Sequence, residues 1–228
     1  MTQSVSTIDA VDSPSPTPLA PLRVYGEPFT YHDSIRCEFV KLADFFESFD
    51  NGVGILNHTW GSVDTSKDGQ VTLTGYSGIM QRPTGDSAGN GYGTYEFTLS
   101  MKGNQQGPAA LLWPGNDEWP GTEMDVVEIH NGRAYGTAHH EKSDGGDGYR
   151  TVTYDGLDES KVHTYTLDWQ PGKLTYAVDG EVYGTITKNV GEDFAHGGVD
   201  AVVGALNINP NTSITLYDVS YTASDTVW

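Results

Sequence analysis

Three carboxylates crowd into one short stretch of the chain, WPGTEMDVVEIHNG at residues 119–132. Glu123, Asp125 and Glu128 lie there among Met, Val and Ile residues. Because alternate residues of a strand share a face, Glu123 and Asp125 are predicted to point the same way. Glu128 joins them only if an extra residue at Val126–Val127 forms a β-bulge. A bulge at that position would present all three carboxylates on one face of the strand.

Crowded carboxylates favour a chemical role, because like charges in a cleft raise the pKa of at least one of them. Cleavage of a glycosidic bond fits, since it uses a nucleophilic carboxylate and a protonated acid about 5 Å apart when configuration is retained. Asp125, between the two glutamates, could set which carboxyl group holds the proton. An exposed edge strand that carries acidic residues against aggregation explains the same spacing equally well.

Short segments of alternating apolar and polar residues surround this stretch and are separated by Gly, Asp, Asn or Pro. They are QVTLTG (70–75), YGTYEFTLSM (92–101), TEMDVVEIH (122–130), YRTVTY (149–154), KVHTYTLDW (161–169), KLTYAVDG (173–180), EVYGTIT (181–187), VDAVVGALNI (199–208) and SITLYDVSY (213–221). Asp179-Gly180 and Asp68-Gly69 are typical hairpin turns. Only VKLADFFESF (40–49) has a helical period. The pattern predicts an all-β fold of two packed antiparallel sheets.

Length and composition agree with one β domain, which we expect to span residues 23–228. The chain has 228 residues, 28 of them Gly and 13 Tyr, and this supply of turn-formers and β-formers suits a sandwich. Residues 1–22, which include SPSPTPLAP, are expected to be an extended leader or linker. Cys37 is the only cysteine, so it forms no disulfide within the chain, and we interpret it as a small buried apolar residue.

The net charge of −19 argues against nucleic acid and anionic membrane surfaces as partners. It also disfavours a strongly anionic polymer as substrate, unless a local basic patch offsets the net charge. No apolar run approaches the roughly 20 residues that a membrane span requires. The first residues have neither a basic region nor an apolar region typical of a secretory signal. We expect a monomer with a neutral polysaccharide as its partner.

The stretch around the carboxylates resembles glycoside hydrolase family 16, a family of laminarinase-like and lichenase-like β-glycanases. The bulged signature of this family, E-x-D-x-x-E, matches Glu123-Met-Asp125-Val-Val-Glu128. The resemblance covers roughly residues 45–222. Its further motifs are NGYGTYEFTLSMK (90–102), GPAALLWPGNDEWP (107–120), HTYTLDWQPGKLTYAVDG (163–180) and ALNINPNTSITLYDVSY (205–221).

The resemblance implies a β-jelly-roll sandwich whose concave face forms an open substrate cleft. It implies that Glu123 is the nucleophile, that Glu128 is the general acid and base, and that Asp125 assists the nucleophile. No cofactor takes part in this chemistry, although some relatives carry a structural Ca²⁺ away from the cleft. The implied activity is endo-acting hydrolysis of a β-linked polysaccharide, with a β-1,3- or β-1,3/1,4-glucan expected first and transglycosylation as a variant of it.

The same resemblance suggests residues that contact sugar. These are Trp113 and Trp119 by stacking, Tyr92 and Glu96 on the YGxYE strand, His139 beside the nucleophile, and Asn207 in the cleft. Core packing is the alternative for the two tryptophans, and Glu96 could equally be an outward-facing acid. His140, adjacent to His139, is expected to face the opposite way. Some relatives place a tryptophan where this chain has Asn209, which leaves the sugar subsites open.

Other motifs are better explained by structure than by chemistry. GDSAG (85–89) lacks the strand and helix that a nucleophile elbow requires, so we expect a loop. DTSKDG (64–69) is expected to be a hairpin turn rather than a Ca²⁺ loop. His139-His140-Glu141 lacks the spacing of a zinc site, so we expect no metal there, and His163 is expected to be structural.

The sequence leaves two functions open. The first is a hydrolase of a β-linked polysaccharide, which would act outside the cell. The alternative is a carbohydrate-binding or structural jelly-roll module of a larger assembly, which the Pro-rich leader and the lack of a signal favour slightly. Three crowded acids argue against the module, because binding alone does not need them.

Overall fold

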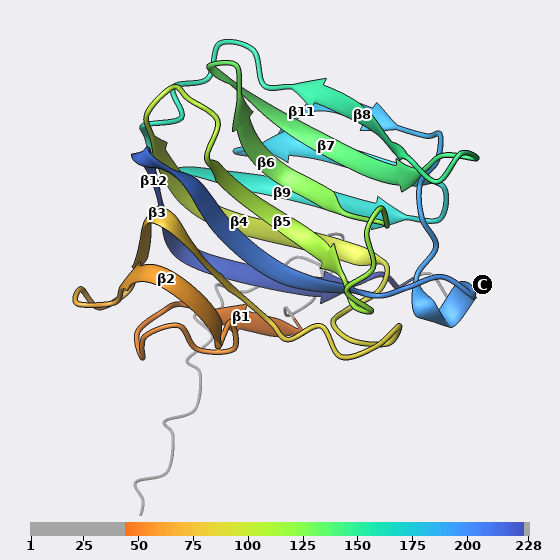
Figure 1. Ribbon diagram of the computed structural model, residues 1–228, viewed down its shortest axis with the longest axis horizontal. Helices are drawn as coiled ribbons and strands as arrows, with labels where there is room; N and C mark the ends of the chain where they lie inside the picture. Colours follow the sequence, from red (N-terminus) through yellow and green to blue (C-terminus); the bar gives the residue numbers. More distant parts are fainter. Residues whose placement is uncertain (1–43, 226–228) are drawn as a thin grey trace, which may run out of the picture. The chain divides into compact units, whose positions relative to one another are not determined.

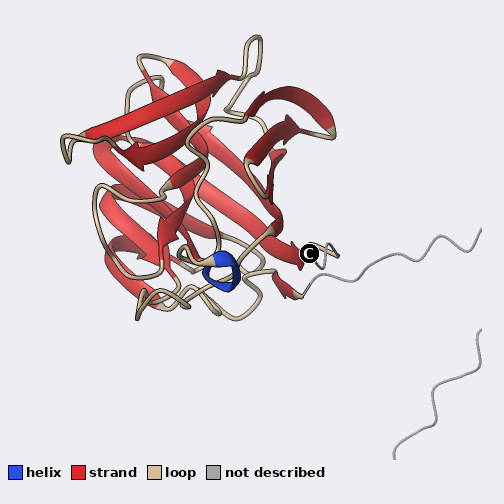
Figure 2. Cartoon of the chain, turned by 90° about the vertical axis from the view of Figure 1, so that its right-hand side faces the viewer, coloured by secondary structure: helices blue, strands red, loops and turns tan. Residues whose placement is uncertain are grey.

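The structure is a computed structural model that describes residues 44–225, all within the unit Val40–Trp228. The expected leader, Cys37 and residues 40–43 lie outside the described part. The strands are β1 (Phe45–Glu47), β2 (His58–Asp64), β3 (Val71–Met80), β4 (Gly93–Lys102), β5 (Pro108–Pro114), β6 (Met124–His130), β7 (Arg133–Glu141), β8 (Asp147–Thr153), β9 (His163–Gln170), β10 (Lys173–Val178), β11 (Glu181–Ile186) and β12 (Ala201–Ala223). Within residues 44–225, the only helix is the 3₁₀ turn Phe194–His196, drawn in blue in Figure 2. No helix of that part is long and apolar enough to cross a membrane.

The prediction of an all-β antiparallel fold is confirmed. The strand order is β11-β10-β9-β4-β12-β5-β6-β7-β8, with β3 and β1 also paired to β12 and β2 paired to β3. The first half of β12 pairs with β5 and its second half pairs with β4, so β12 belongs to both layers. In Figure 1, β5, β6 and β7 lie in front of β4 and β9.

The predicted segments 199–208 and 213–221 form one continuous strand, β12, rather than two. The residues between them shift the register against β3 between Asn209 and Ser213. Such a shift bends a strand without ending it, which allows β12 to pass from one layer to the other.

The core lies between the layers and consists of alternate residues of facing strands. It includes Tyr95, Phe97 and Leu99 of β4, Tyr165, Leu167 and Trp169 of β9, Ala110 and Leu112 of β5, and Met124 and Ile129 of β6. Two buried tyrosines reach across it. The Tyr154 hydroxyl donates to the Val126 carbonyl at 2.7 Å, and the Tyr176 hydroxyl donates to the Thr137 carbonyl at 3.0 Å. These bonds hold β6 and β7 from the core side.

The two hairpin predictions are confirmed, whereas the helical period over 40–49 is misleading. Asp179 and Gly180 both have positive φ angles, 50° and 81°, as a type I′ turn requires. The loop with Asp68-Gly69 joins the antiparallel pair β2 and β3. Residues Phe45–Glu47 form strand β1 on β12, and the ring of Phe45 stacks on Tyr221 at 6.0 Å. Pairing with a long neighbouring strand outweighs a weak local preference for helix.

Asn207 stabilises the bend of β12 from inside the core. Its side chain is fully buried, and its Nδ2 donates to the carbonyls of Gly75 at 2.6 Å and Asn209 at 2.8 Å. Its Oδ1 accepts from the Thr212 hydroxyl at 2.6 Å. The side chain therefore satisfies backbone groups that the register shift leaves without a ladder partner.

We predict that Asn207→Ala lowers the free energy of unfolding by about 2–4 kcal/mol, because several buried polar groups lose their partner at once. Urea denaturation measures this change. Asn211→Ala, at an exposed position of the same bend, serves as the control and should change stability by less than about 0.5 kcal/mol. Equal effects of the two substitutions would contradict the structural role of Asn207.

Candidate active site

A β-bulge in β6 brings the three carboxylates to one face, as predicted. The register of β6 shifts between Asp125 and Glu128 against β7, and opposite Ala110 and Leu111 against β5. Val126 and Val127 are both fully buried in the core. Because both valines occupy the core side, Glu128 returns to the face of Asp125.

Glu123 lies one residue before β6 and continues its ladder, since its carbonyl accepts from the His139 amide at 2.9 Å. Glu123, Asp125 and Glu128 line one cavity of about 220 Å³ together with Gln106, Leu206, Ile208 and His139. Among the carboxylates, Glu128 is oriented by the buried Thr137, whose hydroxyl donates to its Oε1 at 2.7 Å. The cavity thus contains two glutamates on one strand with an aspartate between them.

A chain of charged groups runs from β6 to β8 behind these carboxylates. His139 Nε2 lies 3.4 Å from Asp125 Oδ2, and His139 Nδ1 lies 3.0 Å from Asp147 Oδ1. The imidazole also packs against Trp119, with ring centroids 5.1 Å apart, and Tyr149, at 6.0 Å. Two carboxylates and two rings therefore fix the orientation of His139.

Burial and mutual repulsion shift the proton affinities of this cluster. Burial raises the pKa of Glu123 to about 8, and the charge of Asp125 adds to the shift. Burial also raises the pKa of Asp125 to about 6, although the hydrogen bond from His139 opposes the shift. Burial lowers the pKa of His139, but hydrogen bonds to Asp125 and Asp147 outweigh it and raise that pKa to about 9. At neutral pH the imidazole is therefore a cation, and Glu123 and Asp125 share one proton.

Glu123, Asp125 and His139 also have possible ligand atoms within 4.8 Å of one another. A metal would need a lone pair on an imidazole nitrogen. Both nitrogens of His139 face carboxylates, and the raised pKa keeps both protonated at neutral pH. In the metal-free protein, these contacts make His139 part of a hydrogen-bonded cluster of charged groups.

The two tryptophans expected to stack on sugar lie beside this cluster. Trp113 and Trp119 are stacked with centroids 5.7 Å apart and planes 9° apart, and Trp119 is 48% exposed. Trp113 Nε1 donates to Asp117 Oδ1 at 2.7 Å. Trp113 is two residues beyond Leu111, which pairs with Asp125, so it shares the face of the carboxylates. Contact with sugar stays a prediction for both residues.

Three other residues predicted to contact sugar, Tyr92, Glu96 and Asn207, are not among those that line the carboxylate cavity. Tyr92 is only 6% exposed and packs its ring edge against Trp169, at 5.2 Å, in the core. Glu96 is exposed on the outer face of β4, because its neighbours Tyr95 and Phe97 point into the core. Asn207 points into the core at the bend of β12. The motif comparison located these strands correctly but did not determine which face each residue occupies.

The cleft includes residues that sequence reasoning missed. A second cavity of about 450 Å³ shares Gln106, Glu128 and His139 with the first and adds Asp147 and Tyr149. Asp147 is the first residue of β8. The alternation of β8 could have placed Tyr149 on the same face as Asp147.

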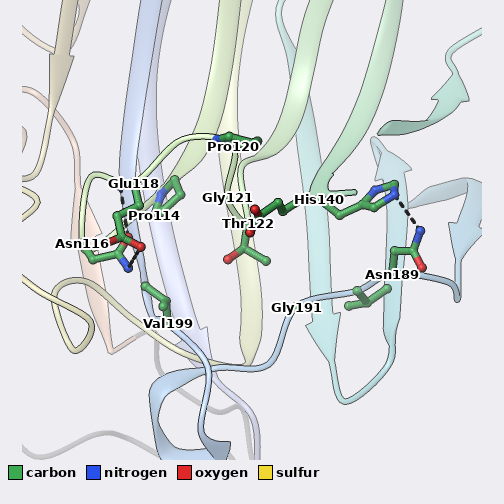
Figure 3. A pocket seen from close by; sticks show the side chains of 12 residues that line it. Pro114, Asn116, Glu118, Pro120, Gly121, Thr122, His140, Asn189, Gly191 and Val199 are labelled. Atoms are coloured by element: carbon green, nitrogen blue, oxygen red, sulfur yellow. Dashed lines mark hydrogen bonds between the residues drawn. The ribbon is translucent and has the colours of Figure 1, made fainter. Parts of the chain in front are cut away.

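His140 faces away from His139, as expected for adjacent strand residues. Figure 3 shows it in a different cavity, of about 450 Å³, with Pro120, Thr122 and Asn189. Its Nε2 lies 2.7 Å from Nδ2 of Asn189. The residues that line this cavity include none of the three carboxylates, so within the described residues it is distinct from the cleft.

We predict that Glu123→Gln stabilises the fold in a pH-dependent way. The pKa of Glu123 is raised in the folded state, so ionisation opposes folding as the pH rises from about 4.3 towards about 8. A neutral glutamine avoids this cost. The gain in melting temperature over wild type should be small at pH 5 and several degrees larger at pH 8. Glu96→Gln, on the outer face, should show no such trend, and a constant gain for Glu123→Gln would contradict the prediction.

Comparison with known proteins agrees with this geometry. Residues 56–208 match the family description "Glycosyl hydrolases family 16". The chain is 28% identical over 176 residues to a beta-glucanase of Paenibacillus macerans, covering 73% of this chain and 71% of that protein. It is 31% identical over 107 residues to a glucan endo-1,3-beta-glucosidase of Cryptopygus antarcticus, covering 41% of this chain and 39% of that one.

Solved structures share the fold at low sequence identity. The Bacillus licheniformis beta-glucanase superposes with a TM-score of 0.60 at 18% identity, over 79% of this chain and 98% of that chain. A prokaryotic lichenase from a mouse hindgut metagenome also gives 0.60, at 16% identity, over 79% and 99%. The family match spans well over half of the chain and contains the bulged strand. The chain is therefore a glycoside hydrolase that belongs to glycosyl hydrolases family 16.

Proposed function

We propose that the chain is an endo-acting, retaining hydrolase of a β-1,3- or mixed β-1,3/1,4-glucan. The observation that supports it most is the bulge of β6, which gathers Glu123, Asp125 and Glu128 in one cavity on the curved sheet. The names of the relatives, beta-glucanase and glucan endo-1,3-beta-glucosidase, support the substrate class. A neutral glucan also suits a chain of net charge −19.

In the proposed double displacement, Glu123 attacks the anomeric carbon while Glu128 protonates the departing glycosidic oxygen. Glu128 then removes a proton from water, which hydrolyses the glycosyl ester on Glu123. The hydroxyl of Thr137 holds Glu128 in place during both steps. This chemistry needs no cofactor.

Asp125 can accept the shared proton from Glu123, which must be ionised before it attacks in the first step. In the empty cleft, burial favours the shared proton on Glu123, where it would block attack. Asp125 is the adjacent carboxylate, and its pKa of about 6 is the lower of the two. When Asp125 takes the proton, Glu123 is released as a carboxylate.

We predict that kcat/KM rises with pH through an apparent pKa of about 6 and falls again towards about 8, because between these values Glu123 and Asp125 hold one proton. Initial rates on a soluble β-glucan across pH 4–10 measure the profile. Asp125→Asn should remove the acid limb near 6. An acid limb that is unchanged in Asp125→Asn would contradict the proton-sharing role.

We predict that Glu123→Gln and Glu128→Gln each lower kcat by roughly 10³-fold or more on β-glucans, measured as released reducing ends.

Azide rescue of the alanine variants distinguishes the nucleophile from the general acid and base. With an activated β-glucoside, Glu128→Ala should yield a β-glycosyl azide, because the glycosyl ester still forms. Glu123→Ala should yield an α-glycosyl azide, because azide then attacks in place of the missing nucleophile.

The control for both losses is Glu96→Gln, which should keep wild-type activity. If no β-glucan is cut by the wild type, but one is bound equally well by wild type and Glu123→Gln, the proposed hydrolysis is wrong.

A further inference from the structure

Exposed apolar side chains continue along the cleft face beyond the carboxylates. Tyr76 of β3 is 71% exposed and pairs with Ile208 of β12, which lines the carboxylate cavity. Trp60 of β2 is 38% exposed. The strand register gives the position of Trp60 relative to the carboxylates.

That register places Trp60 on the same transverse line of the sheet as Glu128. Residues paired across neighbouring strands share a face. The successive pairs are Trp60 with Gly78, Gly78 with Leu206, Leu206 with Ala109, and Ala109 with Glu128. Four steps of about 4.8 Å separate the two residues by about 19 Å of sheet. A glycan chain that lies across the strands at Glu128 would therefore reach Trp60 after several sugar rings.

Because Gly78 has no side chain, the indole ring of Trp60 can lie directly against the backbone of β3. A Cβ atom at residue 78 would lie 2.1 Å from Cζ2 and 2.5 Å from Cη2 of Trp60. Gly78 lies within strand β3 and is not among the positive-φ glycines, so the backbone does not require glycine there. The space for the indole is what requires it. The ring lies on the sheet with part of its surface open to solvent.

We propose that Trp60, seated on Gly78, is a distal sugar-stacking subsite that determines the preference of the enzyme for long glucan chains. This inference rests on the proposed function. Stacking suits a pyranose, whose ring carbons present an apolar face that an indole covers while the hydroxyls stay in water. The strand order places β5, β12, β3 and β2 on this side of β6, and only β7 and β8 on the other side. Trp60 thus lies at the end of the longer arm of the cleft.

The test measures kcat/KM on β-glucan oligosaccharides of increasing length. For the wild type, kcat/KM should rise with length and show a final increase when the chain becomes long enough to reach Trp60. Trp60→Ala should remove that final increase, lowering kcat/KM on long chains about ten-fold while leaving the short ones unchanged. Trp60→Tyr, which keeps a flat ring, should retain much of the increase.

Gly78→Ala provides an independent variant, because its methyl group displaces the indole while Trp60 itself is kept. It should reproduce the selective loss on long chains. Phe46→Ala is the control, since Phe46 is an exposed aromatic residue on β1, in the other layer. It should leave the whole length profile unchanged. Melting temperatures of all variants show whether each remains folded under the assay conditions.

The possible outcomes separate the two proposals. An active wild type whose length profile is unchanged in Trp60→Ala overturns the subsite and leaves the proposed function intact. An equal loss at every length would also overturn the subsite, because it would show that Trp60 only supports the sheet. If the wild type cuts no β-glucan of any length, the proposed function fails and the subsite fails with it.

Discussion

The burial of two successive valines is the constraint on which the site depends. In a regular strand, one of Val126 and Val127 would face the cleft and Glu128 would face the core. Both instead lie in the core, where the Tyr154 hydroxyl bonds to the Val126 carbonyl. Because apolar burial is favourable and a buried unpaired carboxylate is costly, the bulge is the arrangement that satisfies both demands. The geometry of the carboxylates follows from core packing on the other side of the strand.

The cost of gathering three acids is reduced by their surroundings. His139 is a cation between Asp125 and Asp147, and Glu123 and Asp125 share a proton rather than carry two charges. The Thr137 hydroxyl donates a hydrogen bond to the carboxylate of Glu128. The elements that provide these groups, β6, β7 and β8, are consecutive in sequence and adjacent in the sheet. A stretch of about thirty residues therefore carries both the carboxylates and the groups that balance them.

The alternation of apolar and polar residues predicted the all-β class, and the Asp-Gly pairs predicted the hairpins. The resemblance to the bulged family signature predicted that Glu128 shares a face with Glu123 and Asp125. It could not determine which face Tyr92, Glu96 and Asn207 occupy, since a motif identifies a strand while the packing of the opposite layer decides which of its residues are buried. The single strand β12 was also missed, because a bend and a turn have similar compositions. Trp60 could not be recognised, as its place on the cleft depends on pairings across five strands that are distant in sequence.

The central claim is that Glu123 forms a covalent bond with the sugar during turnover. A β-glucan oligosaccharide with a 2-fluoro substituent and a dinitrophenolate leaving group should trap this ester, because the fluorine slows its hydrolysis more than its formation. Mass spectrometry of the digested protein then locates the adduct. We predict one glycosyl group on the peptide that contains Glu123, with the fragment ions placing it on that residue. An adduct on Glu128, or release of the phenolate with inversion and no adduct, would contradict it.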